Sequence, residues 1–259
     1  MSGNEAPDER APVELALLRV SPLTALEAVD AICSAAAGAH GFVVTNPNLS
    51  HLSRLKRDPE YRALYATADL SIPDGWPVVR MLHLHGATRA VRLVGTDVLP
   101  LVCTEAQRRG LSVGFLGGSD DAAVVAAENT RARYPGLQVT FTDPAPVGFD
   151  RDEESFQAWT LSLPERWADI VFVGLGEPRQ TIVSLKLRDD PRARVLMGVG
   201  KAVEFVSGSA PRAPDWVVDR GWEWAHRTFT EPRRLGPRYL QGALDLPPML
   251  LAELRRRHP

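Results

Sequence analysis

The chain has 259 residues, of which 44% are hydrophobic, and its formal net charge is −2. This length and apolar content are sufficient for a buried core, so we expect a globular protein rather than a disordered one. The 30 basic residues do not exceed the 32 acidic ones, and this balance excludes a general nucleic-acid binder, which carries a strong basic excess. The charge is uneven along the chain: from Lys201 onward ten basic and seven acidic residues give +3, and the preceding 200 residues carry −5. An acidic body with a basic tail is compatible with an anionic membrane surface.

The N-terminal segment 1–12 is polar and carries three acids, which predicts a disordered leader and not a secretory signal. Uncharged apolar runs of about 18 residues, the length that spans a membrane, do not occur in the sequence. Cys33 and Cys103 each lie in an apolar helical context, which favours buried reduced thiols over a disulfide or a metal site. These features together predict a cytoplasmic protein.

After the leader, short β-branched or aromatic runs alternate with helical patterns. The predicted strands are, in chain order, 42–45, 70–72, 112–116, 138–142, 170–173 and 195–198. The predicted helices are 22–37, 48–67, 76–84, 97–109, 120–134, 152–163 and 178–187. Parallel strands need crossover helices, so this alternation predicts an α/β fold with a Rossmann-like, mainly parallel sheet and helices on both faces. Ligands of such sheets bind beyond the carboxyl ends of the strands.

Polar residues directly follow the first two predicted strands. Thr45-Asn46-Pro47-Asn48 follows the first strand, and Pro73-Asp74-Gly75 follows the second. An Asp-Gly pair at this point is also typical of a plain turn. If the strands are parallel neighbours, Asp74 and Asn48 project into one crevice, where a carboxylate can accept a hydroxyl proton and an amide can orient a substrate.

Glycine turns follow three later strands. Gly117-Gly118 and Gly174-Leu175-Gly176 each precede a helix, whose N-terminal N–H groups can hold a phosphate, although neither turn matches a Walker loop or a full dinucleotide fingerprint. Gln180 is a candidate for hydrogen bonding to a sugar or base edge, and the alternative is an exposed helix residue. Gly200-Lys201 follows the last strand and leads to Glu204.

Two cations are candidates for phosphate contact. Lys201 is one of only three lysines beside 27 arginines, and Arg92 lies in the run Arg92-Leu93-Val94-Gly95-Thr96-Asp97. The six histidines are scattered and no Asp-x-Asp triplet ends a strand, so we expect no metal site. A Gly-x-Ser-x-Gly elbow and a catalytic cysteine are also missing from the sequence.

The composition changes near the C-terminus, which divides the chain into a core over 13–207 and an appendage over 208–259. Segment 212–239 contains three tryptophans and six arginines, a mixture that suits an anionic partner at an interface. A surface helical hairpin with cation–π contacts is the alternative. Beyond it, leucines precede Arg255-Arg256-Arg257, which predicts either an interfacial amphipathic segment or an ordinary terminal helix docked on the body.

Seven ordered blocks resemble the WecG/TagA/CpsF family of bacterial glycosyltransferases over about residues 13–240. The blocks are Thr45/Asn48, Ala68-Asp69 leading to Asp74-Gly75, Arg92 to Asp97, Phe115-Leu116-Gly117-Gly118, Gly174-Leu175-Gly176-Glu177-Pro178-Arg179-Gln180, Gly198-Val199-Gly200, and Arg212-Ala213-Pro214 through Arg238-Tyr239.

The resemblance implies an inverting transfer of a sugar, N-acetylmannosamine or a related hexose, without a metal or another cofactor. The donor would be a UDP-sugar, and the acceptor a polyprenyl-diphosphate-linked saccharide at the inner face of the plasma membrane, in cell-envelope or exopolysaccharide synthesis. Asp74 matches the family's proposed general base. The expected substrate-binding residues are Thr45, Asn46, Asn48, Gly75, Arg92, Gly117, Gly118, Gly174, Gly176, Gln180, Gly200, Lys201 and Glu204. The arginines expected to meet the lipid diphosphate or the membrane are Arg212, Arg227, Arg233, Arg234 and Arg238.

The sequence departs from the family pattern at three places. Asn46 stands where the family has the Thr of Thr-x-Asn, Thr181 stands where an acid usually follows the glutamine, and Glu204-Phe205 replaces Phe-Asp. These departures keep a non-catalytic nucleotide-sugar-binding protein open as an alternative, and the glycine turns alone would also fit a nucleotide-dependent oxidoreductase. The sequence leaves the transferred sugar, the acceptor saccharide and the formation of a homo-oligomer open.

Overall fold

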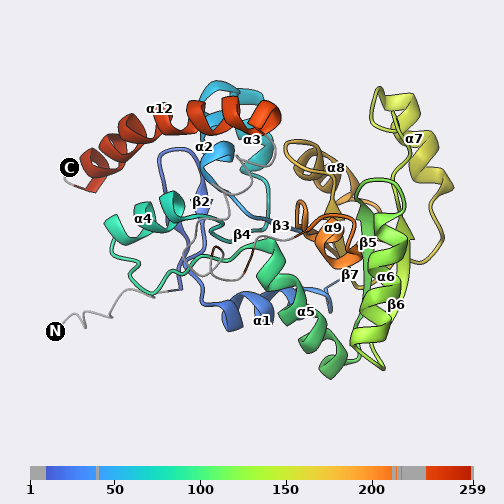
Figure 1. Ribbon diagram of the computed structural model, residues 1–259. Coiled ribbons are helices and arrows are strands. Elements are labelled where there is room, and N and C mark those ends of the chain that lie inside the picture. Colours follow the sequence, from blue (N-terminus) through green and yellow to red (C-terminus); the bar gives the residue numbers. More distant parts are fainter. Residues whose placement is uncertain (1–9, 39–40, 212–213, 215–216, 218–231, 258–259) are drawn as a thin grey trace.

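In the computed structural model, the described residues are 10–38, 41–211, 214, 217 and 232–257 (Figure 1). Six strands of this part of the chain form one sheet in the order β4-β3-β8-β7-β5-β6, and every neighbouring pair is parallel. The strands are β3 (Phe42–Thr45), β4 (Leu70–Ser71), β5 (Ser112–Gly117), β6 (Gln138–Asp143), β7 (Ile170–Gly174) and β8 (Val195–Gly198). All six predicted strands are confirmed, and the fold is the expected Rossmann-like α/β fold.

The predicted helices are also confirmed, with one division. The helix expected over 48–67 is two helices, because Pro59 lacks an N–H and disfavours a helical residue before it. Asp58 separates the two, and its carboxylate accepts a hydrogen bond from Tyr61 N at 2.9 Å to begin the second. The helices are α1 (Ala25–Ala35), α2 (Leu49–Arg57), α3 (Pro59–Tyr65), α4 (Trp76–Leu84), α5 (Gly95–Arg109), α6 (Ala122–Arg133), α7 (Glu153–Ser162), α8 (Arg179–Leu187), α9 (Ala202–Ser207) and α12 (Pro232–Arg257).

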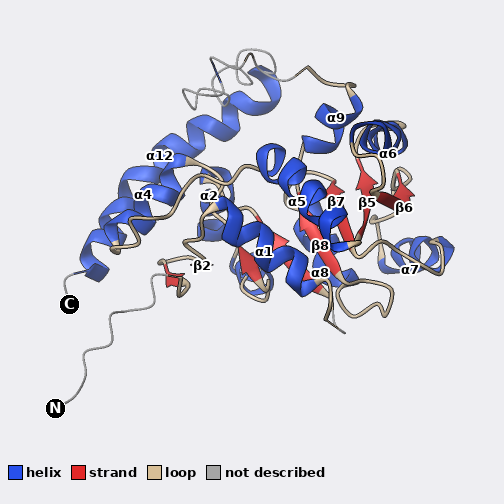
Figure 2. Cartoon of the chain, turned by 90° about the horizontal axis from the view of Figure 1, so that it is seen from below, coloured by secondary structure: helices blue, strands red, loops and turns tan. Residues whose placement is uncertain are grey.

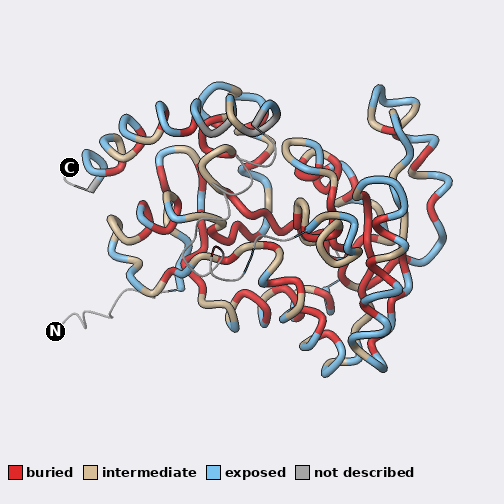
Figure 3. Tube along the Cα trace, viewed as in Figure 1, coloured by how far each residue is buried: buried red, intermediate tan, exposed pale blue. Residues whose placement is uncertain are grey.

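Both faces of the sheet are covered, because successive side chains of a strand point to opposite faces. Val44 and Phe172 belong to the cluster packed under α1, α5, α6 and α9, whereas Val43 and Val173 belong to the cluster packed under α7 and α8. Figure 2 shows β5, β6 and β7 between α6 on one side and α7 on the other. The trace through the strands is largely buried (Figure 3).

Cys33 and Cys103 lie in the first of these clusters as free thiols. Burial raises the pKa of the Cys33 thiol to about 11 and that of Cys103 to about 12. Thiols with such pKa values are poor nucleophiles at neutral pH, so both cysteines are core residues.

A third cluster lies beside the sheet edge formed by β4. It joins α2, α3, α4 and α12 to an antiparallel pair, β1 (Val13–Glu14) and β2 (Arg19–Val20). The sequence did not predict this pair, since two-residue strands are too short to show periodicity. The six-residue helix α9 was missed for the same reason.

The long terminal helix α12 is docked on the body along α2 and α4, on the side of the molecule remote from α6 and α7 (Figure 1). Asp245, which is 6% exposed, forms ion pairs with Lys56 (3.1 Å) and Arg57. Glu253, which is 2% exposed, accepts a hydrogen bond from Ala16 N at 2.7 Å and lies 2.8 Å from His85 Nε2. The docked-helix alternative is therefore confirmed for residues 232–257.

Candidate active site

A pocket of about 870 Å³ opens at the carboxyl ends of the strands, where ligands of parallel sheets bind. Residues that follow all six strands of the sheet contribute to its lining. They include Asn46 and Asn48 after β3, Asp74 after β4, Gly118 and Ser119 after β5, Pro144 and Gly148 after β6, Gly176, Glu177 and Gln180 after β7, and Gly200, Lys201 and Glu204 after β8; Gly174, the last residue of β7, also lines the pocket. The expectation that the polar residues converge beyond the strand ends is thereby confirmed.

Asp74 and Asn48 meet in this pocket. Asn48 caps α2, and its Oδ1 accepts a hydrogen bond from Ser50 N at 3.1 Å, which leaves Nδ2 to donate to Asp74 Oδ2 at 3.3 Å. The two loops are also joined by Asp74 N, which donates to Pro47 O at 2.9 Å. Gly75 adopts a φ of +122°, which residues with a side chain rarely adopt, so the Asp-Gly pair is what turns the chain here. The cap and the turn together hold the half-buried Asp74 carboxylate at the pocket wall.

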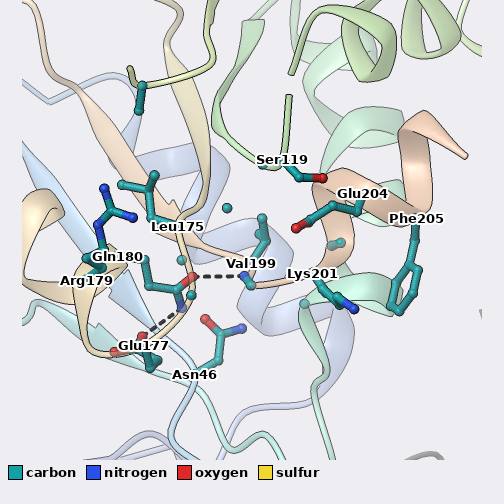
Figure 4. A pocket seen from close by; sticks show the side chains of 18 of the residues that line it. Asn46, Ser119, Leu175, Glu177, Arg179, Gln180, Val199, Lys201, Glu204 and Phe205 are labelled. Carbon is teal, nitrogen blue, oxygen red and sulfur yellow. Dashed lines mark hydrogen bonds between the residues drawn. The ribbon is translucent and has the colours of Figure 1, made fainter. Parts of the chain in front are cut away.

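Gln180 connects the turns after β7 and β8. Its Oε1 accepts a hydrogen bond from Gly200 N at 3.0 Å, and its Nε2 donates to Glu177 Oε1 at 2.7 Å (Figure 4). A Cβ at Gly198 would lie 2.9 Å from Gln180 Nε2, so the strand end must be glycine for this side chain to fit. Gln180 is 4% exposed, and the alternative of an exposed helix residue is therefore wrong.

Asn46 carries a nearly buried amide that faces the pocket. The residue is 5% exposed, and within the described part of the chain neither Nδ2 nor Oδ1 has a hydrogen-bond partner. Figure 4 shows this amide between Gln180 and Lys201. A buried amide without partners costs free energy, and its two atoms could bond to a group that offers both a donor and an acceptor.

In the turn after β5 the backbone lies close to neighbouring parts of the chain. Gly118 has a φ of +91° and donates its N–H to Gly174 O at 2.8 Å, and a Cβ on Gly118 would come within 2.8 Å of Ala122 Cβ. The backbone of this turn leads into the start of α6, so the N-terminal end of a twelve-residue helix lies next to the pocket. Such an end attracts anions.

The sequence model for the WecG/TagA/CpsF family of glycosyl transferases matches residues 13–259 of the chain. The chain belongs to this family. It is 29% identical over 196 residues to the N-acetylglucosaminyldiphosphoundecaprenol N-acetyl-beta-D-mannosaminyltransferase of Bacillus spizizenii, a match that covers 74% of the chain and 72% of the relative. The protein is thus a glycosyltransferase with a Rossmann-like fold.

Four of the residues expected to bind substrate in this glycosyltransferase do not line the pocket: Thr45, Gly75, Arg92 and Gly117. Thr45 is 3% exposed, and its hydroxyl lies 2.8 Å from Ser71 Oγ, so it links β3 to β4 instead. Arg92 is half-buried outside the lining.

The expected lipid-diphosphate arginines lie mostly beyond what the structure describes. Arg212 and Arg227 fall outside the described residues, and so do the side chains of Arg234 and Arg238, whereas Arg233 is exposed. Their contact with the lipid diphosphate or the membrane stays a prediction.

Two lining residues, His51 and Glu177, were not selected from the sequence. Glu177 accepts hydrogen bonds from Tyr61 Oη at 2.7 Å and from Thr181 Oγ1 at 2.8 Å. Thr181, one of the three departures noted in the sequence, thus donates to a carboxylate four residues earlier in the chain. The sequence signals that point to the pair are the spacing of Asn48 and His51, which is that of a capping box, and an acid within a glycine turn.

The protonation state of Glu177 follows from its neighbours. Burial raises the pKa of a carboxyl group, but the adjacent His51 and the hydrogen bonds from Tyr61 and Thr181 outweigh it and hold the pKa of Glu177 well below its usual value. Glu177 is therefore ionised at neutral pH, and burial, together with the charge of Glu177, raises the pKa of Tyr61. Among the described residues, no group of three or more His, Cys, Asp or Glu side chains is arranged to hold a metal ion.

Proposed function

We propose that the protein transfers N-acetylmannosamine, or a related hexose, from a UDP-sugar to a polyprenyl-diphosphate-linked saccharide, with inversion and without a metal. The observation that carries the proposal is the Asp74 carboxylate, held by Asn48 at the wall of a pocket that all six strand ends line, in a chain of this glycosyltransferase family. The named activity of the Bacillus relative supports the choice of sugar and acceptor.

Asp74 is the general base of the proposed reaction. Its carboxylate takes the proton of the acceptor hydroxyl while the hydroxyl oxygen forms a bond to the anomeric carbon of the donor sugar. The bond from that carbon to UDP breaks at the same time, and UDP leaves with the electron pair. A single displacement of this kind inverts the anomeric configuration. The hydrogen bond from Asn48 to Asp74 Oδ2 orients the carboxylate for this step.

The charge that develops on the departing UDP would be stabilised by the protein itself. Lys201 and the start of α6 both adjoin the pocket and supply positive charge and helix N–H groups. Arg179 contributes less, because its guanidinium forms two hydrogen bonds to the Asp150 carboxylate. Asn46, with its amide unpartnered in the described structure, is suited to an amide-like group of the donor, either the acetamido group or the uracil edge.

The outer face of α12 supports a peripheral place on the membrane. Four leucines of this helix are exposed: Leu240 (65%), Leu244 (66%), Leu251 (54%) and Leu254 (40%). At about 100° per residue they fall in one narrow sector, opposite the sector of the docked Asp245, Met249 and Glu253. An ordinary surface helix buries its apolar stripe, and this one turns leucines outward while acids face the body.

A membrane surface fits this stripe. Arg233 and Arg255 of the same helix are exposed on the side of these leucines and would meet anionic headgroups. Among the described residues, no helix has both the length and the apolar character to cross a bilayer. We therefore propose that the protein rests on the inner face of the plasma membrane, where a polyprenyl-linked acceptor resides.

A donor and acceptor screen tests the proposal. UDP release is measured with a panel of UDP-sugars, with and without a short-chain polyprenyl-diphosphate-linked N-acetylglucosamine, in buffer containing a metal chelator. The expected result is UDP release that requires the acceptor and persists with the chelator. UDP binding without transfer for every pair would support the non-catalytic alternative. Family membership as a glycosyltransferase leaves the oxidoreductase alternative without support.

A further inference from the structure

A row of polar side chains in close contact runs from Asp74 along the pocket wall to Glu177. Asn48 Nδ2 donates to Asp74 Oδ2 at 3.3 Å, and Asn48 Oδ1 lies 2.8 Å from His51 Nδ1. On the other side of the imidazole, His51 Nε2 lies 3.3 Å from Glu177 Oε1. The two inner members are almost out of contact with solvent, since the side chains of His51 and Glu177 are 4% and 10% exposed.

The contacts of His51 restrict where its protons lie. Nδ1 lies near both the backbone N–H of Asn48 (3.1 Å) and its Oδ1 (2.8 Å). An unprotonated Nδ1 accepts from the N–H, and a protonated Nδ1 donates to Oδ1, so one of the two contacts is a hydrogen bond in each protonation state. Nε2 lies 3.3 Å from Glu177 Oε1, a close contact without hydrogen-bond geometry, and a carboxylate at this distance favours a proton on the nitrogen that faces it. A carboxylate that fixes the protonated nitrogen also fixes the orientation of the ring, and the ring in turn holds the asparagine that contacts Asp74.

Glu177 also reaches the other side of the pocket. Its Oε1 accepts from Gln180 Nε2 at 2.7 Å, and Gln180 Oε1 accepts from Gly200 N at 3.0 Å (Figure 4). One buried carboxylate is therefore connected to the loops after β3 and β4 through His51, and to the turns after β7 and β8 through Gln180. These two sets of loops carry Asp74 and Lys201. In the proposed reaction Asp74 acts on the acceptor hydroxyl that forms the new bond, and Lys201 acts on the UDP whose bond breaks.

A contribution to stability is not by itself a sufficient reason for such a buried pair. Replacing both members of a buried polar pair by apolar residues often leaves stability unchanged or raises it, although removing one member alone is destabilising. Small errors in the geometry of reacting groups, by contrast, lower the reaction rate strongly. We infer that His51 and Glu177 are positioning residues of the transferase. They hold Asn48, and through it the Asp74 carboxylate, in a fixed position relative to Gln180 and the donor side of the pocket. The inference rests on the proposed role of Asp74 as base.

Kinetics of paired variants test this role. His51→Ala and Glu177→Ala are expected to lower kcat roughly 10- to 100-fold, with a smaller change in the KM of the donor, because the base is misplaced while the pocket persists. Glu177→Gln keeps the shape and one acceptor oxygen for Gln180 and Thr181, and its NH2 can donate to Tyr61 Oη, so it should recover part of kcat relative to Glu177→Ala. The double variant His51→Ala/Glu177→Ala should lose about as much as one single variant, not the product of both losses, because the two residues act through one path.

A matched control is Asp169→Asn, at the amino end of β7. Asp169 Oδ2 accepts hydrogen bonds from Ser112 N (2.8 Å) and Ser112 Oγ (2.7 Å), so it braces the same strand at the end remote from the pocket. This variant is expected to lower the melting temperature with kcat unchanged. If kcat falls in Asp169→Asn as much as in Glu177→Ala, the loss of kcat reflects a general loosening of the fold, and the inference is overturned.

Asp74→Asn separates failure of this inference from failure of the proposed function. If Asp74→Asn loses turnover while folded His51→Ala and Glu177→Ala keep the wild-type kcat, only the positioning role is overturned. If Asp74→Asn keeps turnover, the base assignment fails, and the positioning role fails with it. If the alanine variants do not fold, His51→Gln decides. A loss of kcat at an unchanged melting temperature supports the inference, whereas an unchanged kcat, or a loss that accompanies a lowered melting temperature, overturns it.

Discussion

Removal of two outward leucines of α12 should release the protein from anionic vesicles. The perturbation is Leu244→Ser together with Leu251→Ser, at positions 66% and 54% exposed on the face opposite the docked side. Since neither side chain is buried against the body, the substitutions are expected to leave the fold and the docking of α12 intact.

The expected magnitude follows from the exposed fractions. Burial of a whole leucine side chain contributes about 1.5–3 kcal/mol, so the four exposed leucines could together contribute roughly 3–7 kcal/mol on insertion into the interface. The exposed fractions of Leu244 and Leu251 sum to a little more than one full leucine side chain. Their replacement therefore removes roughly 2–4 kcal/mol of the free energy of membrane binding. Vesicle binding should therefore weaken about 30-fold or more.

The assay is co-sedimentation with vesicles of phosphatidylglycerol and phosphatidylethanolamine over a range of lipid concentrations. The control is Leu26→Ser/Leu161→Ser, which removes leucines that are 77% and 84% exposed on α1 and α7. The control should bind like the wild type. If both double variants bind equally well, or lose binding equally, the outer face of α12 is not the membrane contact.

Further predictions concern stability and substrate binding. The lowered pKa of Glu177 means that its ionisation stabilises the fold above about pH 4.5, and that this contribution is lost as the pH falls below that value. The free energy of unfolding of the wild type in urea should therefore exceed that of Glu177→Gln by less at pH 3 than at pH 5. A difference in unfolding free energy that does not change with pH would contradict the assignment. Gly174→Ala places a Cβ 2.6 Å from Val203 Cγ2 and should cost about 1–3 kcal/mol of unfolding free energy, measured by denaturation; a neutral result would mean that α9 moves freely against β7. Asn46→Ala should raise the KM of the donor about 10-fold, with little loss of stability, because its amide has no partner within the described protein; a loss of stability at an unchanged KM would show a structural role.

The sheet was predictable from the sequence because buried parallel strands appear as short continuous apolar runs. Runs such as 170–173 and 195–198 stand out between helical patterns, and the rule that ligands bind at the carboxyl ends then located the pocket. The elements that were missed, β1, β2 and α9, have two to six residues each, too few to show a period.

The site was predictable only in part, because the position of a residue at a strand end does not determine which partner its side chain contacts. Thr45 and Asn46 are adjacent at the end of β3, yet Thr45 bonds to Ser71 and Asn46 faces the pocket. The link from His51 to Glu177 joins segments far apart in the chain, whose proximity follows from the strand order rather than from any local pattern.

The most direct test of the account is acceptor-dependent UDP release by wild type and Asp74→Asn, measured with UDP-N-acetylmannosamine and a polyprenyl-diphosphate-linked N-acetylglucosamine. The account predicts turnover by the wild type and a loss of at least about 100-fold in the variant, the usual contribution of a general base. Equal turnover by the two proteins, with the variant folded, would contradict it.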